Sequence, residues 1–136
     1  MKINLPDIDT QKRIIFEEST KEAIAQLKKN LKVEHYPSQT EVDESLFSNA
    51  HLLREREGWE APHQDIVGAY FRHFQELFPD YKTDKKLSEL LGLSSDRRIR
   101  EFKQGNRKVP FNVWRHFLIL TGRAPQDAIK VFGFLG

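Results

Sequence analysis

The sequence of 136 residues contains no cysteine. The chain therefore forms neither disulfide bonds nor thiolate zinc sites. No apolar run approaches the roughly 20 residues that are needed to span a bilayer. The first residues, MKINLPDIDTQKR, lack the apolar core of a secretory signal peptide. These absences predict a cytoplasmic protein that does not use a membrane.

The motifs of common enzymes are also missing. The sequence has no H-E-x-x-H, no P-loop, no G-x-S-x-G and no G-x-G-x-x-G. His73 and Glu76 are three residues apart on a predicted helix, where a surface hydrogen bond is the expected contact. The acidic residues between Glu41 and Glu44 suit a solvated loop better than a metal site. We therefore expect no enzyme, no metal site and no cofactor.

Charge is unevenly distributed, although the net charge is only +2. Residues 1–62 hold 9 Lys/Arg and 12 Asp/Glu, a net charge of −3, whereas residues 63–136 hold 13 and 8, a net charge of +5. Within residues 95–123 the counts are 8 and 2, a net charge of +6. Such asymmetry is expected when one part of a chain binds nucleic acid, but a solvated basic surface would give the same counts.

Residues 1–62 are weakly patterned and are expected to form an N-terminal extension of unknown role. Ser19 and Glu22 match a capping box, the signature of a helix start. Apolar residues then recur at helical spacing, which predicts a helix over about 20–31. The segment before this helix is compatible with a helix, a strand or an extended arm.

The segment that follows this helix contains few regular patterns. His51–Glu57 is compatible with a short helix, and Trp59 is expected to dock on a neighbouring element. Pro62 marks the predicted boundary, so that residues 63–136 form a separate domain.

Helical patterns become strong after this boundary and predict a five-helix domain that is mainly α. The first helix carries a wide apolar stripe with period 3.6: Ile66, Val67, Tyr70, Phe71, Phe74, Leu77 and Phe78. Glycines that commonly end helices follow the next three: Gly92, Gly105 and Gly122. Pro125 is expected to open the last helix. The predicted helices are 64–78, 84–91, 95–104, 110–121 and 125–132.

A short Gly-Leu-Ser turn joins the second and third of these helices. Their apolar side chains can be buried together only if the two helices cross sharply at Gly92. The side chains concerned are Leu87, Leu90, Leu91, Leu93, Ile99 and Phe102. This is the helix-turn-helix arrangement, whose second helix is free to enter a major groove of DNA.

The predicted recognition helix has a polar and basic outer face. If Ile99 and Phe102 face inward, then Arg97, Arg100 and Glu101 point outward. Arginine can bind guanine through two hydrogen bonds, and the basic loop that follows suits phosphates. The predicted DNA-binding residues are Ser94, Ser95, Asp96, Arg97, Arg98, Arg100, Lys103, Asn106, Arg107 and Lys108. The alternative is a solvated helix face on which Arg97 pairs with Glu101.

The segment LSELLGLSSDRRIREFKQGNRKVPFNVWRHFLILTG resembles the helix-turn-helix regulators of phages and mobile elements, the Cro/C1 or XRE family. It also resembles small regulators that accompany anti-CRISPR genes. The turn is one residue longer than in the family pattern, at Ser95 or Asp96. The resemblance covers about residues 63–132. The matching residues are Leu87, Leu91, Gly92, Leu93, Ser94, Ile99, Phe102, Gly105, Arg107, Val109, Pro110 and Trp114.

This resemblance implies a lambda-repressor-like domain and a repressor of its own or a neighbouring operon. Such proteins bind palindromic double-stranded DNA as homodimers, and the apolar end Val131–Leu135 is a candidate for part of the dimer contact. Folding back of this end on its own domain is the alternative. A second hypothesis is an antitoxin or interaction module in which residues 1–62 bind a protein partner.

Overall fold

A computed structural model describes residues 7–136; residues 1–6 of the predicted N-terminal extension lie outside the described part. Residues 7–136 contain five α-helices, four single 3-10 turns and no strand, which confirms a mainly α fold. They divide into two compact units. One is Ser38–Asp127, and the other joins the residues up to Pro37 with Ala128–Gly136. The predicted domain boundary at Pro62 therefore lies inside the larger unit.

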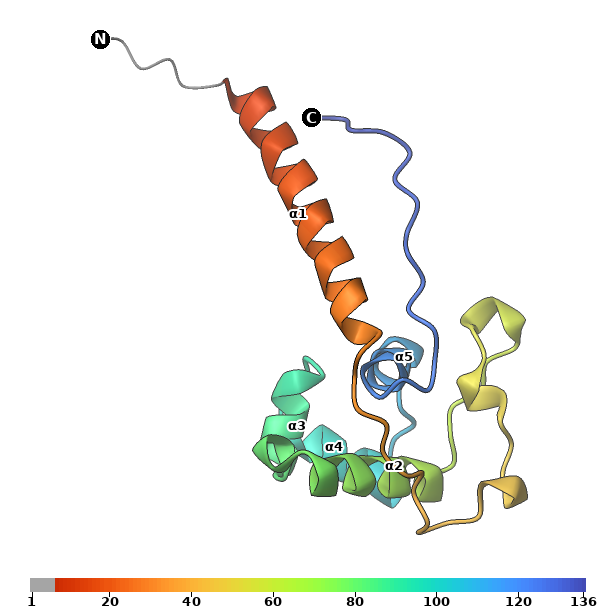
Figure 1. Cartoon of the computed structure of the whole chain (residues 1–136). Coiled ribbons are helices and arrows are strands. Elements are labelled where there is room, and N and C mark those ends of the chain that lie inside the picture. Colours follow the sequence, from red (N-terminus) through yellow and green to blue (C-terminus); the bar gives the residue numbers. More distant parts are fainter. Residues whose placement is uncertain (1–6) are drawn as a thin grey trace. The chain divides into compact units, whose positions relative to one another are not determined.

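Helix α1 of the smaller unit is a single long helix that spans Ile8–Asn30 (Figure 1). It begins at Asp7, whose carboxylate accepts a hydrogen bond from the Thr10 N–H at 2.7 Å. The helix predicted over 20–31 is part of α1, but Ser19 is not its N-cap. The Ser19 hydroxyl lies inside the helix and donates to the Phe16 carbonyl at 2.9 Å. None of the side chains of α1 is buried.

The C-terminal residues belong to the same unit as α1. The rings of Phe16 and Phe134 lie 5.5 Å apart. The helix predicted over 125–132 does not form, and this prediction was wrong. The side chains of Ile129 and Phe132 are 90% and 93% exposed. Short helices depend on tertiary packing of an apolar face, and these side chains have no such packing.

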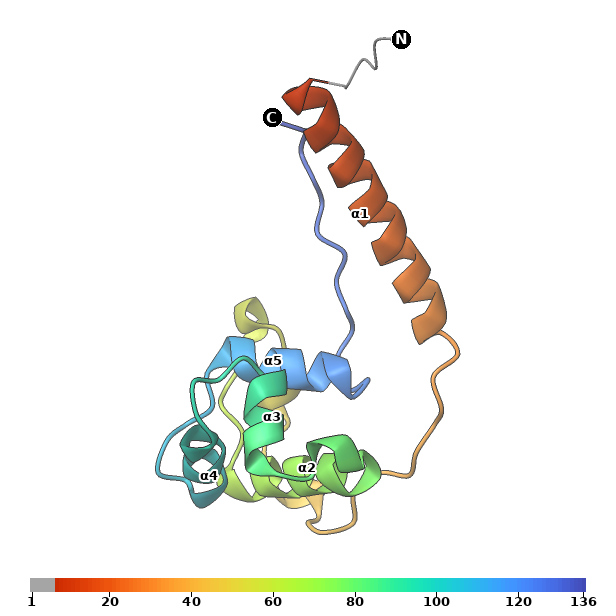
Figure 2. The same ribbon diagram turned by 90° about the vertical axis from the view of Figure 1, so that its left-hand side faces the viewer.

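The larger unit contains the other four helices (Figure 2). Each of them lies within one residue of its predicted bounds, so four of the five helices predicted for this part of the chain are confirmed. A 3-10 turn, η4 (Pro79–Tyr81), separates the first two. The four are α2 (Gln64–Leu77), α3 (Asp84–Leu90), α4 (Asp96–Gln104) and α5 (Phe111–Leu120).

Aromatic rings from α2 and α5 form the centre of the core. The ring of Trp114 is fully buried and stacks on Tyr70, with 5.6 Å between centroids and 18° between planes. Phe71 meets Phe117 edge-on at 4.9 Å. Phe78, which was predicted for the same stripe, follows the last residue of α2 and is 37% exposed.

Residues 38–62 pack against this core instead of forming a separate extension. They contain three single 3-10 turns, so the short helix predicted over His51–Glu57 is represented by two of these turns. Trp59 docks as predicted: its Nε1 donates to the His51 carbonyl at 3.1 Å, and its ring lies 5.2 Å from that of Phe111. The turns are η1 (Glu44–Leu46), η2 (Ala50–Leu52) and η3 (Glu55–Glu57).

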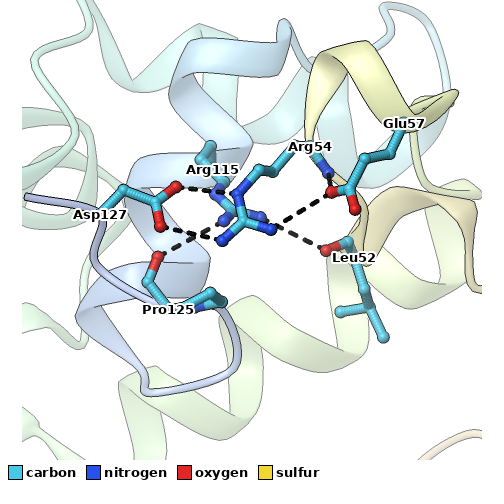
Figure 3. Close-up of polar contacts among 6 residues, drawn as sticks. All are labelled: Leu52, Arg54, Glu57, Arg115, Pro125 and Asp127. Carbon is cyan, nitrogen blue, oxygen red and sulfur yellow. Dashed lines mark hydrogen bonds and ion pairs between the residues drawn. The ribbon is translucent and has the colours of Figure 1, made fainter. Parts of the chain in front are cut away.

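Two arginines tie this segment to the end of the unit (Figure 3). Arg54 donates from Nε and Nη2 to the two carboxylate oxygens of Asp127, at 2.8 and 2.9 Å. Arg115 donates from Nη1 to the Leu52 carbonyl at 3.3 Å and from Nη2 to the Pro125 carbonyl at 3.4 Å. At Pro125 and Asp127, where these contacts are made, the chain is not helical.

Candidate nucleic-acid interface

The turn between α3 and α4 is a Schellman motif. The Gly92 N–H donates to the Glu89 carbonyl at 3.2 Å, and the Leu93 N–H donates to the Ser88 carbonyl at 2.9 Å. Gly92 has a φ of +71°, which glycine adopts without a clash of Cβ. The chain therefore changes direction sharply between the two helices (Figure 2).

Helix α4 is anchored through one apolar face. Ile99 is fully buried and Phe102 is 2% exposed. The Lys103 ammonium lies 2.8 Å from Asp84 of α3, and both side chains are largely covered. Lys103 was one of the predicted DNA-binding residues, but its ammonium forms an ion pair between the two helices.

Helix α4 begins directly after the two serines of the turn. Ser95 occupies the N-cap position, and Asp96 is the first helical residue. The Asp96 carboxylate lies 2.9 Å from Nη1 of Arg100, and this hydrogen bond lowers the pKa of Asp96. Ser94 and Ser95 are exposed at the N-terminal end of the helix, where base edges are usually met.

The outward side of α4 carries exposed arginines, as predicted. The side chain of Glu101, which was predicted to point outward with them, is largely covered. The Arg97 side chain is 80% exposed and that of Arg100 is 50% exposed. The Glu101 side chain is only 17% exposed, because three guanidinium groups surround its carboxylate. The i,i+4 ion pair between Arg97 and Glu101 forms, with 2.9 Å between Nε and Oε1.

The two other arginines reach the opposite oxygen of this carboxylate. Nε of Arg107 lies 2.8 Å from Oε2 of Glu101, and Nη1 of Arg98 lies 3.6 Å from it. The hydrogen bond from Arg107 is the main cause that lowers the pKa of Glu101. The loop of Arg107 is set by a second Schellman motif, in which the Asn106 N–H donates to the Glu101 carbonyl at 3.0 Å.

A shallow depression of about 570 Å³ lies between this loop and α4. It brings together four of the predicted DNA-binding residues, whereas Ser94, Ser95 and Lys108 are exposed outside its lining. The charged side chains of the lining are Arg97, Arg100, Arg107 and Glu101. The lining therefore has a net positive charge, which suits phosphate oxygens. The depression is lined by Arg97, Arg100, Glu101, Gln104, Asn106 and Arg107.

A buried polar cluster in the same unit was not predicted. Trp114 donates from Nε1 to Nδ1 of His51 at 3.1 Å, and the His51 side chain is buried. The Tyr70 hydroxyl donates to Glu44, and Arg123 lies 4.0 Å above the Tyr70 ring. Glu44, which was expected in a solvated loop, is thus tied to α2. Residues 38–62 are held on the helices by polar contacts as well as by packing.

We expect acid to destabilise this unit through His51. Burial is the main cause that lowers the pKa of His51 from its ordinary value of 6.5, and Arg123 acts in the same direction while Glu44 opposes it. Since the unfolded chain then takes up the proton first, the stabilisation is complete above pH 6.5 and is lost as the pH falls below it. Urea unfolding at about pH 7.5 and about pH 5 measures this loss.

A matched variant isolates the histidine in this experiment. His51→Gln keeps a hydrogen-bond acceptor for Trp114 but cannot be protonated in this range. Its free energy of unfolding should change less between the two pH values than that of the wild type. Equal changes in both proteins would assign the pH dependence to other groups.

Within the part of the chain that the structure describes, no group of three or more His, Cys, Asp or Glu is placed to hold a metal ion. None of the helices among residues 7–136 is both long and apolar enough to cross a membrane. Comparisons with models of protein families, with curated proteins and with solved structures gave no match.

Proposed function

We propose that this protein is a sequence-specific, double-stranded DNA-binding regulator whose α4 enters the major groove. One observation carries the proposal: α4 buries Ile99 against the core while Arg97 and Arg100 remain exposed. A helix held in this way behind a sharp turn can present side chains to base edges. Guanidinium groups match the O6 and N7 acceptors of guanine in that groove.

The surroundings of α4 are suited to the DNA backbone. Arg107 and Lys108 lie exposed in the loop that follows the helix. Contacts of this kind to phosphate fix the position of a protein on the duplex without reading its sequence. The net charge of +6 over residues 95–123 favours the same partner.

The resemblance to Cro/C1 regulators supplies the biological role in this proposal. The larger unit would be a lambda-repressor-like domain of a cytoplasmic repressor from a phage or mobile element. It would block transcription of its own or a neighbouring operon. The Schellman turn at Gly92, the buried Trp114 and the order of α2–α5 support this assignment.

Selection of bound duplexes from random DNA tests the proposal directly. An enriched short motif is expected for the wild-type protein. The double variant Arg97→Ala/Arg100→Ala should lose the enrichment while it keeps its helical circular dichroism spectrum. If the wild type enriches no sequence even at low salt, sequence-specific DNA binding is contradicted.

We further propose a homodimer, which would place two recognition helices on half-sites about one helical turn apart. Exposed apolar side chains in the smaller unit favour a protein partner of some kind. Those of Leu31, Phe132 and Leu135 are 86%, 93% and 97% exposed. A second copy is the partner in the repressor hypothesis, whereas a toxin or another small protein is the partner in the antitoxin hypothesis.

Sedimentation distinguishes these partners. A dimer of the purified protein, alone or on a palindromic duplex, supports the repressor hypothesis. A monomer under both conditions contradicts the homodimer. Co-purification of a second small protein that binds residues 1–62 would favour the antitoxin alternative.

A further inference from the structure

Arg97, Arg98 and Arg107 all pair with Glu101. This arrangement has a consequence for how the protein would discriminate between DNA sequences. We propose that Glu101 is a specificity-determining residue that weakens binding to non-specific DNA more than binding to the operator. It would do so by occupying the arginines that phosphates would otherwise attract. This inference rests on the proposed function, because it concerns the same surface of α4.

Glu101 has the geometry of an internal competitor for phosphate. One carboxylate oxygen, Oε1, lies 2.9 Å from Nε of Arg97. The other, Oε2, lies 2.8 Å from Nε of Arg107 and 3.6 Å from Nη1 of Arg98. These are distances of charge-assisted hydrogen bonds, the same kind that arginine forms with a phosphate oxygen. The Nε donor of either arginine becomes available to a phosphate only if the phosphate replaces this carboxylate, and the charge of the guanidinium is already partly neutralised.

Exchange of this kind reduces the gain from a phosphate contact. On random DNA, each arginine that leaves Glu101 exchanges one anionic partner for another, and the carboxylate that remains repels the nearby backbone. On the operator, Arg97 gains base contacts in addition. An arginine has five N–H donors, so one contact to Glu101 leaves donors for a guanine. The carboxylate therefore opposes non-specific binding more strongly than operator binding.

Glu101 differs from the other acids on α3 and α4 in the number of arginines that it engages. Asp96 binds Arg100 alone, at 2.9 Å. The Asp84–Lys103 pair connects α3 to α4 and is mostly covered, with side chains 22% and 19% exposed. Glu101 is the acid that lines the basic depression beside the exposed arginines.

Glu101→Gln tests this role because it removes the charge and keeps the shape. Two duplexes serve as probes: one of random sequence and the one enriched by selection with the wild type. The variant should bind the random duplex about tenfold more tightly at low salt, with a salt slope steeper by about one unit. Its affinity for the enriched duplex should rise less, so that the ratio of the two affinities falls.

Glu76→Gln is the matched control, since it removes an exposed charge on α2, outside the depression. It should leave the affinity ratio close to that of the wild type. Glu101→Ala is a second way to remove the charge, and both variants are checked for folding by circular dichroism. A purely structural role of Glu101 would alter stability and leave the affinity ratio and the salt slope unchanged.

The outcomes separate the two proposals. If the wild type enriches no duplex, the function proposed above fails, and the role of Glu101 fails with it. If the wild type binds its enriched duplex and the folded Glu101 variants keep the wild-type affinity ratio, only the role of Glu101 is contradicted. A lower ratio in both variants, with an unchanged ratio in Glu76→Gln, supports it.

Discussion

Trp114→Ala is expected to lower the free energy of unfolding of the larger unit by about 3–5 kcal/mol. The side chain is fully buried between rings of α2 and α5, so its loss leaves a cavity among aromatic neighbours. It also leaves the buried Nδ1 of His51 without its hydrogen-bond donor. Urea unfolding followed by far-ultraviolet circular dichroism measures the effect.

Two further variants separate packing from hydrogen bonding. Trp114→Phe retains an aromatic ring but removes Nε1, and an unmade hydrogen bond in a buried site costs about 1–3 kcal/mol. It should therefore be less destabilising than Trp114→Ala. His116→Ala, on an exposed position of the same helix, should have a small effect. If Trp114→Ala and His116→Ala lose similar amounts, the aromatic cluster is not the centre of the core.

Arg97→Ala or Arg100→Ala is expected to weaken operator binding by about 1–3 kcal/mol if its guanidinium pairs with guanine. The same change should relax the preference at one base position. Both side chains lie outside the core, so the variants should keep the stability of the wild type. Titration against the enriched duplex and against duplexes with single base changes tests both parts of this prediction.

Changes in the following loop should have a different signature. Arg107→Ala and Lys108→Ala should weaken binding to all sequences about equally and reduce the salt slope by about one unit each. Arg107→Ala should in addition weaken binding to random sequences slightly further, because it leaves Glu101 less neutralised. Arg72→Ala, which removes an arginine on α2 that pairs with Glu41, is the control. If every arginine variant binds as the wild type does, α4 is not a recognition helix.

Ile99→Ala provides the opposite control on the same helix. Ile99 is fully buried, so this variant should lose roughly 2–5 kcal/mol of stability. Its DNA binding should decline through unfolding and recover when the temperature is lowered. A stable variant that binds no DNA would assign Ile99 to the interface instead of the core.

The sequence predicted the helices of residues 64–120 well because each combines a periodic apolar stripe with local signals at its ends. Gly92, Gly105 and Gly122 all have positive φ values at the ends of their helices. Thr83 caps α3 by accepting a hydrogen bond from the Lys86 N–H at 3.2 Å, and threonine is a common residue at this position. These signals are local, so they can be recognised without knowledge of the rest of the fold.

Local patterns were misleading where other contacts decided the structure. Ser19 and Glu22 have the spacing of a capping box, but α1 had already begun at Ile8. Apolar spacing after Pro125 suggested a helix, but the side chains of Ile129 and Phe132 are exposed and have no surface to pack against. In each case the local spacing alone did not determine where a helix begins.

The candidate interface was predictable only in part. The exposed arginines of α4 follow from the helical wheel, and the pair of Arg97 with Glu101 follows from i,i+4 spacing. The approach of Arg107 to Glu101 depends on the course of the loop after Gly105, which no periodicity describes. The hydrogen bond from Trp114 to His51 joins residues that are far apart in the chain. No local sequence pattern around either residue indicates that the two side chains meet.

The absence of buried side chains in α1 has a consequence for the tolerance of the sequence to substitution. Changes at core positions of the larger unit alter its packing directly, whereas changes along α1 leave no cavity and overfill none. Most substitutions along α1 that retain helix formation should therefore cost little packing energy. A strict requirement for a particular side chain on α1 would point to a contact such as that of Phe16 with Phe134, or to a partner molecule, and not to a packed core along the helix.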